Sequence, residues 1–314
     1  MIVKKKDELE DTGLSSKFQT RTQRIIERDG SFNVKKTGIS RLESFNLYHF
    51  LINISWLHFL NLALVFYVFV NLIFTVLYFF AGAEHLGIET DRGVLHNFMN
   101  CFFFSAQTLT TVGFGRMNPQ NTITNIIATF EAGIGLMVFA LATGLLYGRF
   151  SRPATNMMFS RNAIFAKWGD NLKAFQFRVA NAFTTEMMDA EIQIIASWLE
   201  PSGDGSEMRK FYNLKLEYAK IVFFPTVWTV NHIIDEESPL YGKSIDDMTR
   251  NEAEFLILFK AYDDTFAQTV HARFSYRHDE LVWGAKFKRV ILIDEKGKSF
   301  VSLDKMSDYE KVEI

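Results

Sequence analysis

The chain has 314 residues, of which 48% are apolar, 15% aromatic and 22% charged, with a formal net charge of −2. This apolar fraction, with 32 phenylalanines, excludes a disordered chain, and 18 glycines and 5 prolines exclude a collagen-like one. The single cysteine, Cys101, excludes an intramolecular disulfide framework and a multi-cysteine metal site. A nucleic-acid-binding protein normally carries a basic patch, so the near-zero net charge predicts no nucleic-acid partner.

Two segments are long and apolar enough to cross a membrane. Residues 59–80 carry no charge, and residues 123–148 carry only Glu131. At 1.5 Å per residue the shorter run extends about 33 Å, against about 30 Å for the hydrocarbon core of a bilayer. The alternative is a buried core helix, but neither run has the polar stripe of a surface-packed helix. The sequence therefore predicts two transmembrane helices within a membrane-spanning domain at residues 58–152.

Lysines and arginines are concentrated before the first run and after the second, whereas the connector, residues 81–122, holds only Arg92 and Arg116. Because positively charged residues remain on the cytoplasmic side, the connector is expected outside and both chain termini in the cytoplasm. We therefore predict a multi-pass protein of the cell (inner) membrane.

The segment before the first run divides into two parts. Residues 1–43 are charged and are expected to form a cytoplasmic N-terminal segment. Residues 44–57 place Asn46, His49 and Asn53 on one side of a helix and apolar residues on the other. Such an amphipathic helix can lie in the membrane interface, and we predict a slide helix here.

The connector contains the segment that carries the chemistry. Residues 97–109 are apolar but extend only about 20 Å as a helix, so they predict a re-entrant pore helix. They continue into the sequence TTVGFG. A potassium filter replaces the hydration shell of the ion with backbone carbonyls, and glycine supplies the positive φ that this backbone needs. Irregular backbone at membrane depth must line a cavity, so several copies must surround one axis. The expected filter is Thr110, Thr111, Val112, Gly113, Phe114 and Gly115, with K⁺ at Thr111, Val112, Gly113 and Phe114.

Residues 111–115 resemble the potassium-channel signature TVGYG, with Phe114 in the place of tyrosine. Residues 142–153 are similar to the inner-helix exit of inward-rectifier potassium channels. Residues 271–276 (HARFSY) and 279–284 (DELVWG) resemble the cytoplasmic domain of that family. The resemblance covers most of the chain and is closest to the prokaryotic branch (KirBac-type). Phenylalanine removes a hydroxyl behind the filter and leaves the carbonyl ladder intact.

Short β-type runs separated by turn residues predict an all-β domain over residues 153–314. The resemblance implies an immunoglobulin-like sandwich. The expected fold is therefore a membrane α-helical pore domain followed by a cytoplasmic all-β sandwich. The resemblance also implies a homotetramer in which the loop at residues 262–268 forms a second constriction. The alternative for that loop is an ordinary hairpin connection. The predicted strands are 175–183, 190–198, 213–222, 228–234, 255–261, 268–276 and 289–294.

The second membrane run carries the expected pore-lining residues. Gly135, Phe139, Thr143 and Tyr147 recur every four residues and share one helix face, which lines the pore in the resembling family. Four Tyr147 rings could close the pore by dewetting, although Tyr147 also suits an interfacial tyrosine. Glu131 is either a structural residue hydrogen-bonded behind the filter or a direct ion site.

Four basic residues follow the second run. Their first expected role is to keep this end of the helix on the cytoplasmic side, as the positive-inside rule describes. A second role that fits a basic juxtamembrane cluster is contact with anionic membrane lipids. These residues are Arg149, Arg152, Arg161 and Lys167.

No pattern in the chain indicates catalysis. His271 and His278, followed by Asp279 and Glu280, lack a third spaced metal ligand, and no nucleophile motif accompanies them. We therefore expect no enzyme, no metal centre and no cofactor apart from K⁺ ions in the pore.

The sequence thus predicts a passive potassium-selective channel of inward-rectifier type, gated at the inner-helix crossing and by the cytoplasmic domain. The resemblance implies weak rectification, because Phe139 and Lys260 occupy places that are acidic in strong rectifiers, while Asp264 remains as an acidic residue. One alternative is a ligand-gated two-span potassium channel, but the tail has no glycine-rich phosphate loop. The other is a non-conducting membrane-tethered sensor, which leaves the TVGFG run unexplained.

Overall fold

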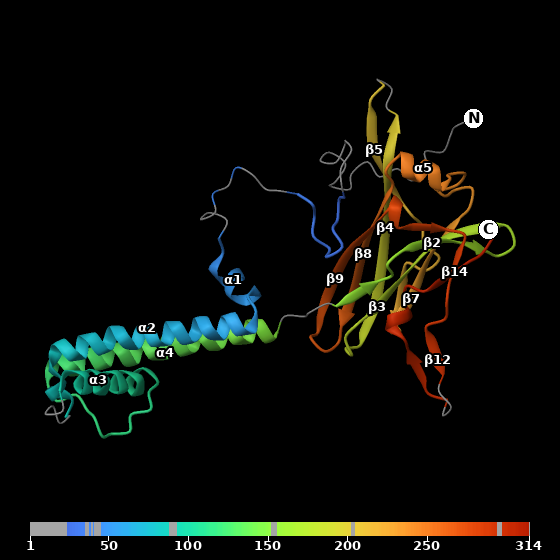
Figure 1. Cartoon of the computed structure of the whole chain (residues 1–314). Helices are drawn as coiled ribbons and strands as arrows, with labels where there is room; N and C mark the ends of the chain where they lie inside the picture. Colours follow the sequence, from blue (N-terminus) through green and yellow to red (C-terminus); the bar gives the residue numbers. More distant parts are fainter. Residues whose placement is uncertain are drawn as a thin grey trace. The chain divides into compact units, whose positions relative to one another are not determined.

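The computed structural model describes residues 24–34, 38, 40, 45–87, 93–151, 156–201, 205–293 and 297–313. The chain divides into two compact units, coloured along the sequence in Figure 1. A helical unit comprises Gly38–Arg152, and a β unit comprises Met1–Thr37 together with Pro153–Ile314. Residues 24–34, the continuous described part of the N-terminal segment that was predicted to be separate, belong to the β unit.

The helical unit contains the predicted helices. The predicted spans lie within α2 and α4, which among the described residues are the two helices long and apolar enough to cross a membrane. The pore helix begins three residues earlier than predicted, at Val94, and the slide helix is shorter than predicted. The helices are α1 (Leu47–Asn53), α2 (Trp56–Gly82), the short 3₁₀ helix η1 (Ala83–Leu86), α3 (Val94–Leu109) and α4 (Thr122–Phe150).

Polar side chains fix where these helices begin. Asn46 accepts a hydrogen bond from the His49 amide at the start of α1, at 3.0 Å. Asn121 Oδ1 accepts the Thr124 amide at the start of α4, at 2.8 Å, and Thr124 Oγ1 faces back toward the Asn121 amide. Such caps satisfy amides that have no partner inside the helix, which sets the first residue of each helix despite uniform hydrophobicity.

The helical unit buries only a small core of its own. Val70, Phe74 and Tyr78 of α2 pack against Cys101 and Phe104 of α3. Many other large apolar side chains on α2 and α4 are exposed. An exposed apolar surface of this extent is expected of helices that contact lipid or other copies of the chain.

The β unit is a sandwich of two five-stranded sheets, labelled in Figure 1. In the first sheet the strand order is β1-β3-β2-β10, with β7 also pairing with β3. In the second it is β5-β4-β8-β9, with β6 also pairing with β4. The first sheet contains β1 (Met157–Phe159), β2 (Ala163–Trp168), β3 (Leu172–Asn181), β7 (Val227–Ile234) and β10 (Leu281–Trp283). The second contains β4 (Met187–Pro201), β5 (Glu207–Asn213), β6 (Lys220–Phe223), β8 (Glu254–Asp263) and β9 (Gln268–Arg277).

The core lies between these two sheets. Phe175 of β3 stacks on Phe255 of β8, with ring centroids 4.4 Å apart, and both side chains are fully buried. Alternate residues of β4, including Ile192 and Ile194, point into the same core. This inward alternation of apolar residues is the period-two pattern of strands that bury one face.

One strand prediction is wrong and several elements were missed. Residues 213–222 do not form one strand, because β5 ends at Asn213 and β6 begins only at Lys220. With three residues, β1 is too short to stand out as a β-type run. Also missed were β2, β10, α5 (Ile245–Arg250), β11 (Ala285–Phe287), β13 (Ser299–Val301) and β14 (Tyr309–Lys311), whereas β12 (Ile291–Ile293) lies inside a predicted run.

The N-terminal residues 24–34 dock on the β unit. The Ile25 amide donates to both carboxylate oxygens of Glu254, at 3.1 and 3.0 Å. The side chains of Ile25 and Ile26 are buried against Phe211 and Leu256. This segment therefore forms part of the domain, although its charged flanks gave no sequence signal of a buried segment.

Candidate functional site

The predicted filter follows directly on the end of α3. The Val112 amide donates to the Gln107 carbonyl at 2.9 Å, which holds the start of the filter against the last turn of the pore helix. From Thr111 onward, φ is positive at every second residue: 58° at Thr111, 55° at Gly113 and 78° at Gly115. In a regular strand successive carbonyls point to opposite sides, whereas alternation of left- and right-handed φ turns them toward the same side. This backbone can present a row of oxygens to one axis.

The glycines of the filter are required by backbone conformation. A Cβ at Gly113 or Gly115 would meet no atom within 4 Å, so crowding inside the subunit does not exclude a side chain. Positive φ disfavours a side chain at these positions, because this conformation costs an L-residue on the order of 1–3 kcal/mol. Thr111 adopts the same conformation without being glycine. Sequence reasoning expected positive φ only at glycines and missed this third position.

Glu131 of α4 is fully buried and lies between the other two long helices. Tyr78 of α2 donates to Glu131 Oε2 at 2.6 Å, and Ser105 of α3 donates to Oε1 at 2.5 Å. Ser105 Oγ also lies 3.0 Å from Oδ1 of Asn71, whose amide nitrogen donates to the Tyr67 carbonyl of its own helix. Both carboxylate oxygens therefore have donors within one subunit. This geometry favours the structural role over a direct ion site.

The four residues of the predicted pore-lining face lie in two environments. Phe139, Thr143 and Tyr147 are exposed in the single subunit, with Phe139 and Tyr147 72% and 73% accessible. Gly135 of α4 is buried against Leu109, the last residue of α3. The accessible residues are free to face the axis of an assembly.

Comparison with known proteins identifies the family to which the chain belongs. Residues 157–314 match the family described as "Inward rectifier potassium channel C-terminal domain", and residues 62–152 match the family described as "Ion channel". The chain is also 32% identical over 289 residues to the inward rectifier potassium channel Kirbac3.1 of Paramagnetospirillum magnetotacticum, covering 92% of this chain and 96% of that protein. The chain belongs to the inward rectifier potassium channel family. Its members are ion channels, so the chain is not an enzyme.

More distant relatives come from animals. The chain is 23% identical to the ATP-sensitive inward rectifier potassium channel 11 of Oryctolagus cuniculus, covering 93% of this chain and 79% of that protein. It is 27% identical to the G protein-activated inward rectifier potassium channel 1 of Bos taurus, covering 87% of this chain and 58% of that protein. Among solved structures, the likeness to the sporulation control protein Spo0M of Bacillus subtilis has a TM-score of only 0.21 at 10% identity, covers 39% of this chain and 46% of that one, and supports no argument.

In this channel-family subunit, Arg149 joins the slide helix to the inner helix. Its guanidinium donates to the carbonyls of Leu51, Ile52 and Ile54 at 2.5, 3.1 and 2.7 Å. It also lies 4.6 Å from the ring centroid of Trp56. Carbonyls at the end of a helix lack partners within the helix, and a cation there is favourable. The sequence predicted a basic anchor here but could not identify these partners.

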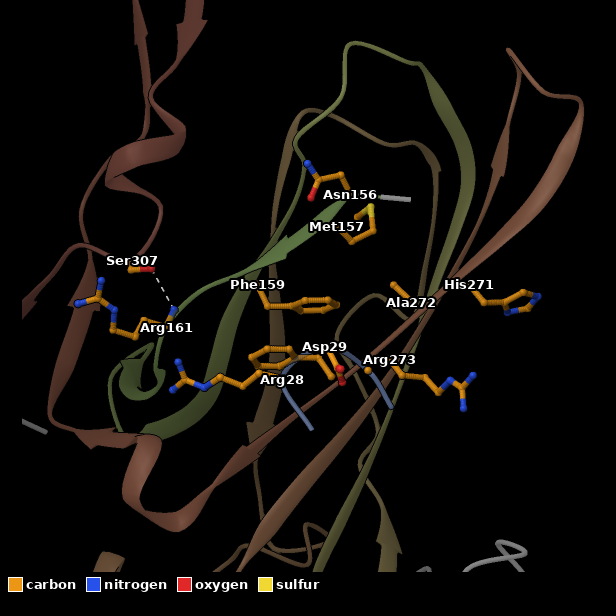
Figure 2. A pocket seen from close by; sticks show the side chains of 12 residues that line it. Arg28, Asp29, Asn156, Met157, Phe159, Arg161, His271, Ala272, Arg273 and Ser307 are labelled. Atoms are coloured by element: carbon orange, nitrogen blue, oxygen red, sulfur yellow. Dashed lines mark hydrogen bonds between the residues drawn. The ribbon is translucent and has the colours of Figure 1, made fainter. Parts of the chain in front are cut away.

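Of the four basic residues predicted to contact lipid, Arg149 is the one described within the helical unit. Arg152 lies outside the described residues. Arg161 and Lys167 belong to the β unit, where Arg161 lines a cavity together with Arg28 and Arg273 (Figure 2) and Lys167 is exposed on β2. Contact of these four residues with anionic lipid therefore stays a prediction.

The expected second constriction is the turn of the β8–β9 hairpin. Its strands pair through Tyr262 with Thr269 and Asp263 with Gln268, so only four residues form the connection. Asp263 is buried, and its Oδ1 accepts the amides of Thr265 and Phe266 at 2.9 and 3.2 Å, while Asp264 is exposed. Lys260 lies on β8 with its Nζ 3.9 Å from Oε2 of Glu191. Glu191 therefore partly neutralises the charge of Lys260.

Proposed function

We propose that this chain forms a homotetrameric potassium-selective channel of inward-rectifier type, which conducts passively across the cell (inner) membrane. The observation that carries the proposal is the alternating φ of residues 111–115, which turns successive carbonyls to one side. A single strand of carbonyls cannot enclose an ion, and such backbone is tolerated at membrane depth only around a cavity. Four copies would complete the site, with K⁺ at Thr111, Val112, Gly113 and Phe114.

The remaining assignments follow from the same assembly. Phe139, Thr143 and Tyr147 line the inner pore, with Tyr147 as the gate, and the β8–β9 turn of each cytoplasmic domain forms a second constriction. Glu131 supports the filter through its bonds to Tyr78 and Ser105. Both termini are cytoplasmic, because the segments flanking the spans are rich in lysine and arginine. The same basic character supports contact with anionic lipids.

Potassium flux into liposomes containing the purified protein tests this proposal. We expect uptake that barium blocks, and much lower uptake of sodium. A non-conducting sensor would give no flux above empty liposomes. A ligand-gated channel of the alternative class would conduct only after addition of its ligand.

The filter itself is tested by Gly113→Ala. Because φ at Gly113 is 55°, alanine should distort the carbonyl row and abolish selective potassium flux in a folded tetramer. Gly242→Ala is the matched control, since Gly242 has φ of 73° and open space around a Cβ but lies in the β unit. Selectivity for potassium unchanged in Gly113→Ala would overturn the filter assignment.

A further inference from the structure

An arginine stands directly after the proposed filter. Arg116 follows Gly115 in the connector that is expected to lie outside the membrane, and its side chain is exposed in the single subunit. Basic residues are normally kept on the cytoplasmic side of a membrane protein, and this connector has only two of them, Arg92 and Arg116. Membrane topology therefore does not account for an arginine in this place.

The backbone on both sides of Arg116 is held in place. On one side lies the filter backbone, which is bonded to the end of α3. On the other side, the side chain of Met117 packs against the core of the helical unit, and the Asn118 amide donates to the Leu86 carbonyl at 3.1 Å. The Cα of Arg116 therefore keeps a defined position at the outer end of the filter.

The positive charge of Arg116 has no counter-charge nearby in its own subunit. Within the residues that the structure describes, no carboxylate lies within ion-pairing distance of its guanidinium. Glu84, the acidic residue of the connector that the structure describes, lies instead beside His85, with Oε1 3.9 Å from Nε2. The guanidinium of an exposed arginine is always charged, so each subunit contributes one uncompensated positive charge at this position.

Four copies around one axis would bring four such charges to the rim of the outer mouth. Rings of charged side chains select among ions by repulsion, and low-dielectric walls focus their field. The repulsion energy of a divalent cation is twice that of K⁺, so a depletion of about threefold for K⁺ becomes about ninefold for a divalent cation. We propose that Arg116 is a specificity-determining residue that keeps extracellular divalent cations out of the filter. This inference rests on the proposed channel function.

Single-channel recording in planar bilayers tests the proposal, with barium as the divalent cation. In Arg116→Gln the extracellular barium concentration that gives half block should fall about tenfold, and K⁺ conductance at about 0.1 M salt should rise about threefold. Block by cytoplasmic barium should not change. At about 1 M salt the Debye length is only about 3 Å, so the differences should disappear. Arg116→Lys keeps the charge and should behave as the parent. Arg250→Gln, which removes an exposed arginine from the β unit, should also behave as the parent.

Chemical restoration of the charge gives a second test. The parent has a single cysteine, Cys101, which is fully buried, so thiol reagents should leave its conductance unchanged. In Arg116→Cys, a cationic methanethiosulfonate reagent applied outside should restore the parent's conductance and barium sensitivity. An anionic methanethiosulfonate reagent should instead raise the conductance and strengthen barium block. Neither reagent should act from the cytoplasmic side, and this difference also identifies the outer face of the channel in the bilayer.

Three results would overturn the role of Arg116 in a channel that conducts. These are equal barium sensitivity of the parent and Arg116→Gln, a difference between them that persists at about 1 M salt, and equal effects of the cationic and anionic reagents on Arg116→Cys. The second of these results would assign the effect to side-chain bulk rather than to charge. A parent that conducts no K⁺ would overturn the proposed function, and this inference with it.

Discussion

The inner helix and the pore helix meet without an intervening side chain, because a Cβ on Gly135 would lie 2.1 Å from the carbonyl oxygen of Leu109. Leu109 is the last residue of α3 and directly precedes the filter. Any bulk at Gly135 must therefore displace the backbone that positions the filter. This contact joins α4, which carries the proposed gate, to the backbone that precedes the proposed filter.

We expect Gly135→Ala to impair conduction and selectivity together. The clash is with backbone, and overpacking of this kind costs about 1–3 kcal/mol. Potassium and sodium flux in liposomes, with the unfolding temperature of the protein, would measure both effects. Gly133→Ala is the control, because a Cβ at Gly133 meets no atom within 4 Å. Wild-type selectivity in Gly135→Ala would show that the two helices can separate without consequence.

The sequence predicted the elements whose signal is local. The uncharged run of residues 59–80 and the TVGFG motif are each contained in one short stretch; the run lies within α2, and the motif follows the end of α3. The contact of Gly135 with Leu109 joins residues distant in sequence, and a lone glycine in an apolar helix has several equally good explanations. Likewise, docking of Ile25 depends on the carboxylate of Glu254, 229 residues away, which no periodicity reveals.

The bonds of Glu131 predict how its substitution affects stability. Glu131→Leu leaves the Tyr78 hydroxyl buried without an acceptor, at a cost of about 1–3 kcal/mol, whereas Glu131→Gln keeps one acceptor oxygen. The unfolding temperature should therefore fall in the order parent, Gln, Leu. If Glu131 were instead an ion site, both variants would change conduction while their unfolding temperatures matched the parent.

A pH-dependent latch is expected where Arg24 and Arg28 meet Glu280. Burial raises the pKa of Glu280, but hydrogen bonds from the Arg277 amide, Arg28 and Arg24 outweigh it and place the pKa below the usual value. A lowered carboxyl pKa stabilises the docked state above the usual carboxyl range, and this stabilisation is lost as pH falls through the lowered pKa.

Hydrogen exchange of residues 24–34, corrected for intrinsic rates, should therefore show tight docking at neutral pH and release in acid. Glu280→Gln should dock more weakly at neutral pH and lose that dependence. Asp279→Asn is the control, because its exposed carboxylate lies 3.7 Å from Arg277 and contacts neither Arg24 nor Arg28. Identical acid release in Glu280→Gln would assign the latch to another carboxylate, with Glu254 the first candidate.

The gate assignment predicts that Tyr147→Ala raises potassium flux severalfold. Removal of four exposed rings would widen and rehydrate an apolar constriction. Leu141→Ala removes a side chain of similar exposure from the opposite side of α4 and should change flux little. Unchanged flux in Tyr147→Ala, with membrane insertion verified, would move the gate to the β8–β9 turn.

Rectification gives the last prediction, and it depends on charge along the pore. Block by a multivalent cation requires carboxylates confined in a narrow cavity with low-dielectric walls, where each charge acts strongly. Phe139 supplies none, and the charge of Lys260 is partly offset by Glu191 at 3.9 Å, so Lys260 neither attracts a polyamine nor repels it at full strength. Asp264 is exposed at the hairpin turn and remains as the acidic residue. We therefore expect weak rectification in the unmodified channel.

Phe139→Asp should introduce steep, voltage-dependent block by cytoplasmic spermine, because four carboxylates would then surround one axis. Phe139→Asn is the control, because asparagine is nearly equal in size to aspartate but uncharged. This variant should rectify as weakly as the parent. Asp264→Asn should reduce whatever block the parent shows, since it removes the residual acidic charge. Current–voltage curves in planar bilayers with spermine on the cytoplasmic side measure all three. Steep rectification in the unmodified channel, or equal curves for the Asp and Asn variants, would show that position 139 does not face the ion pathway.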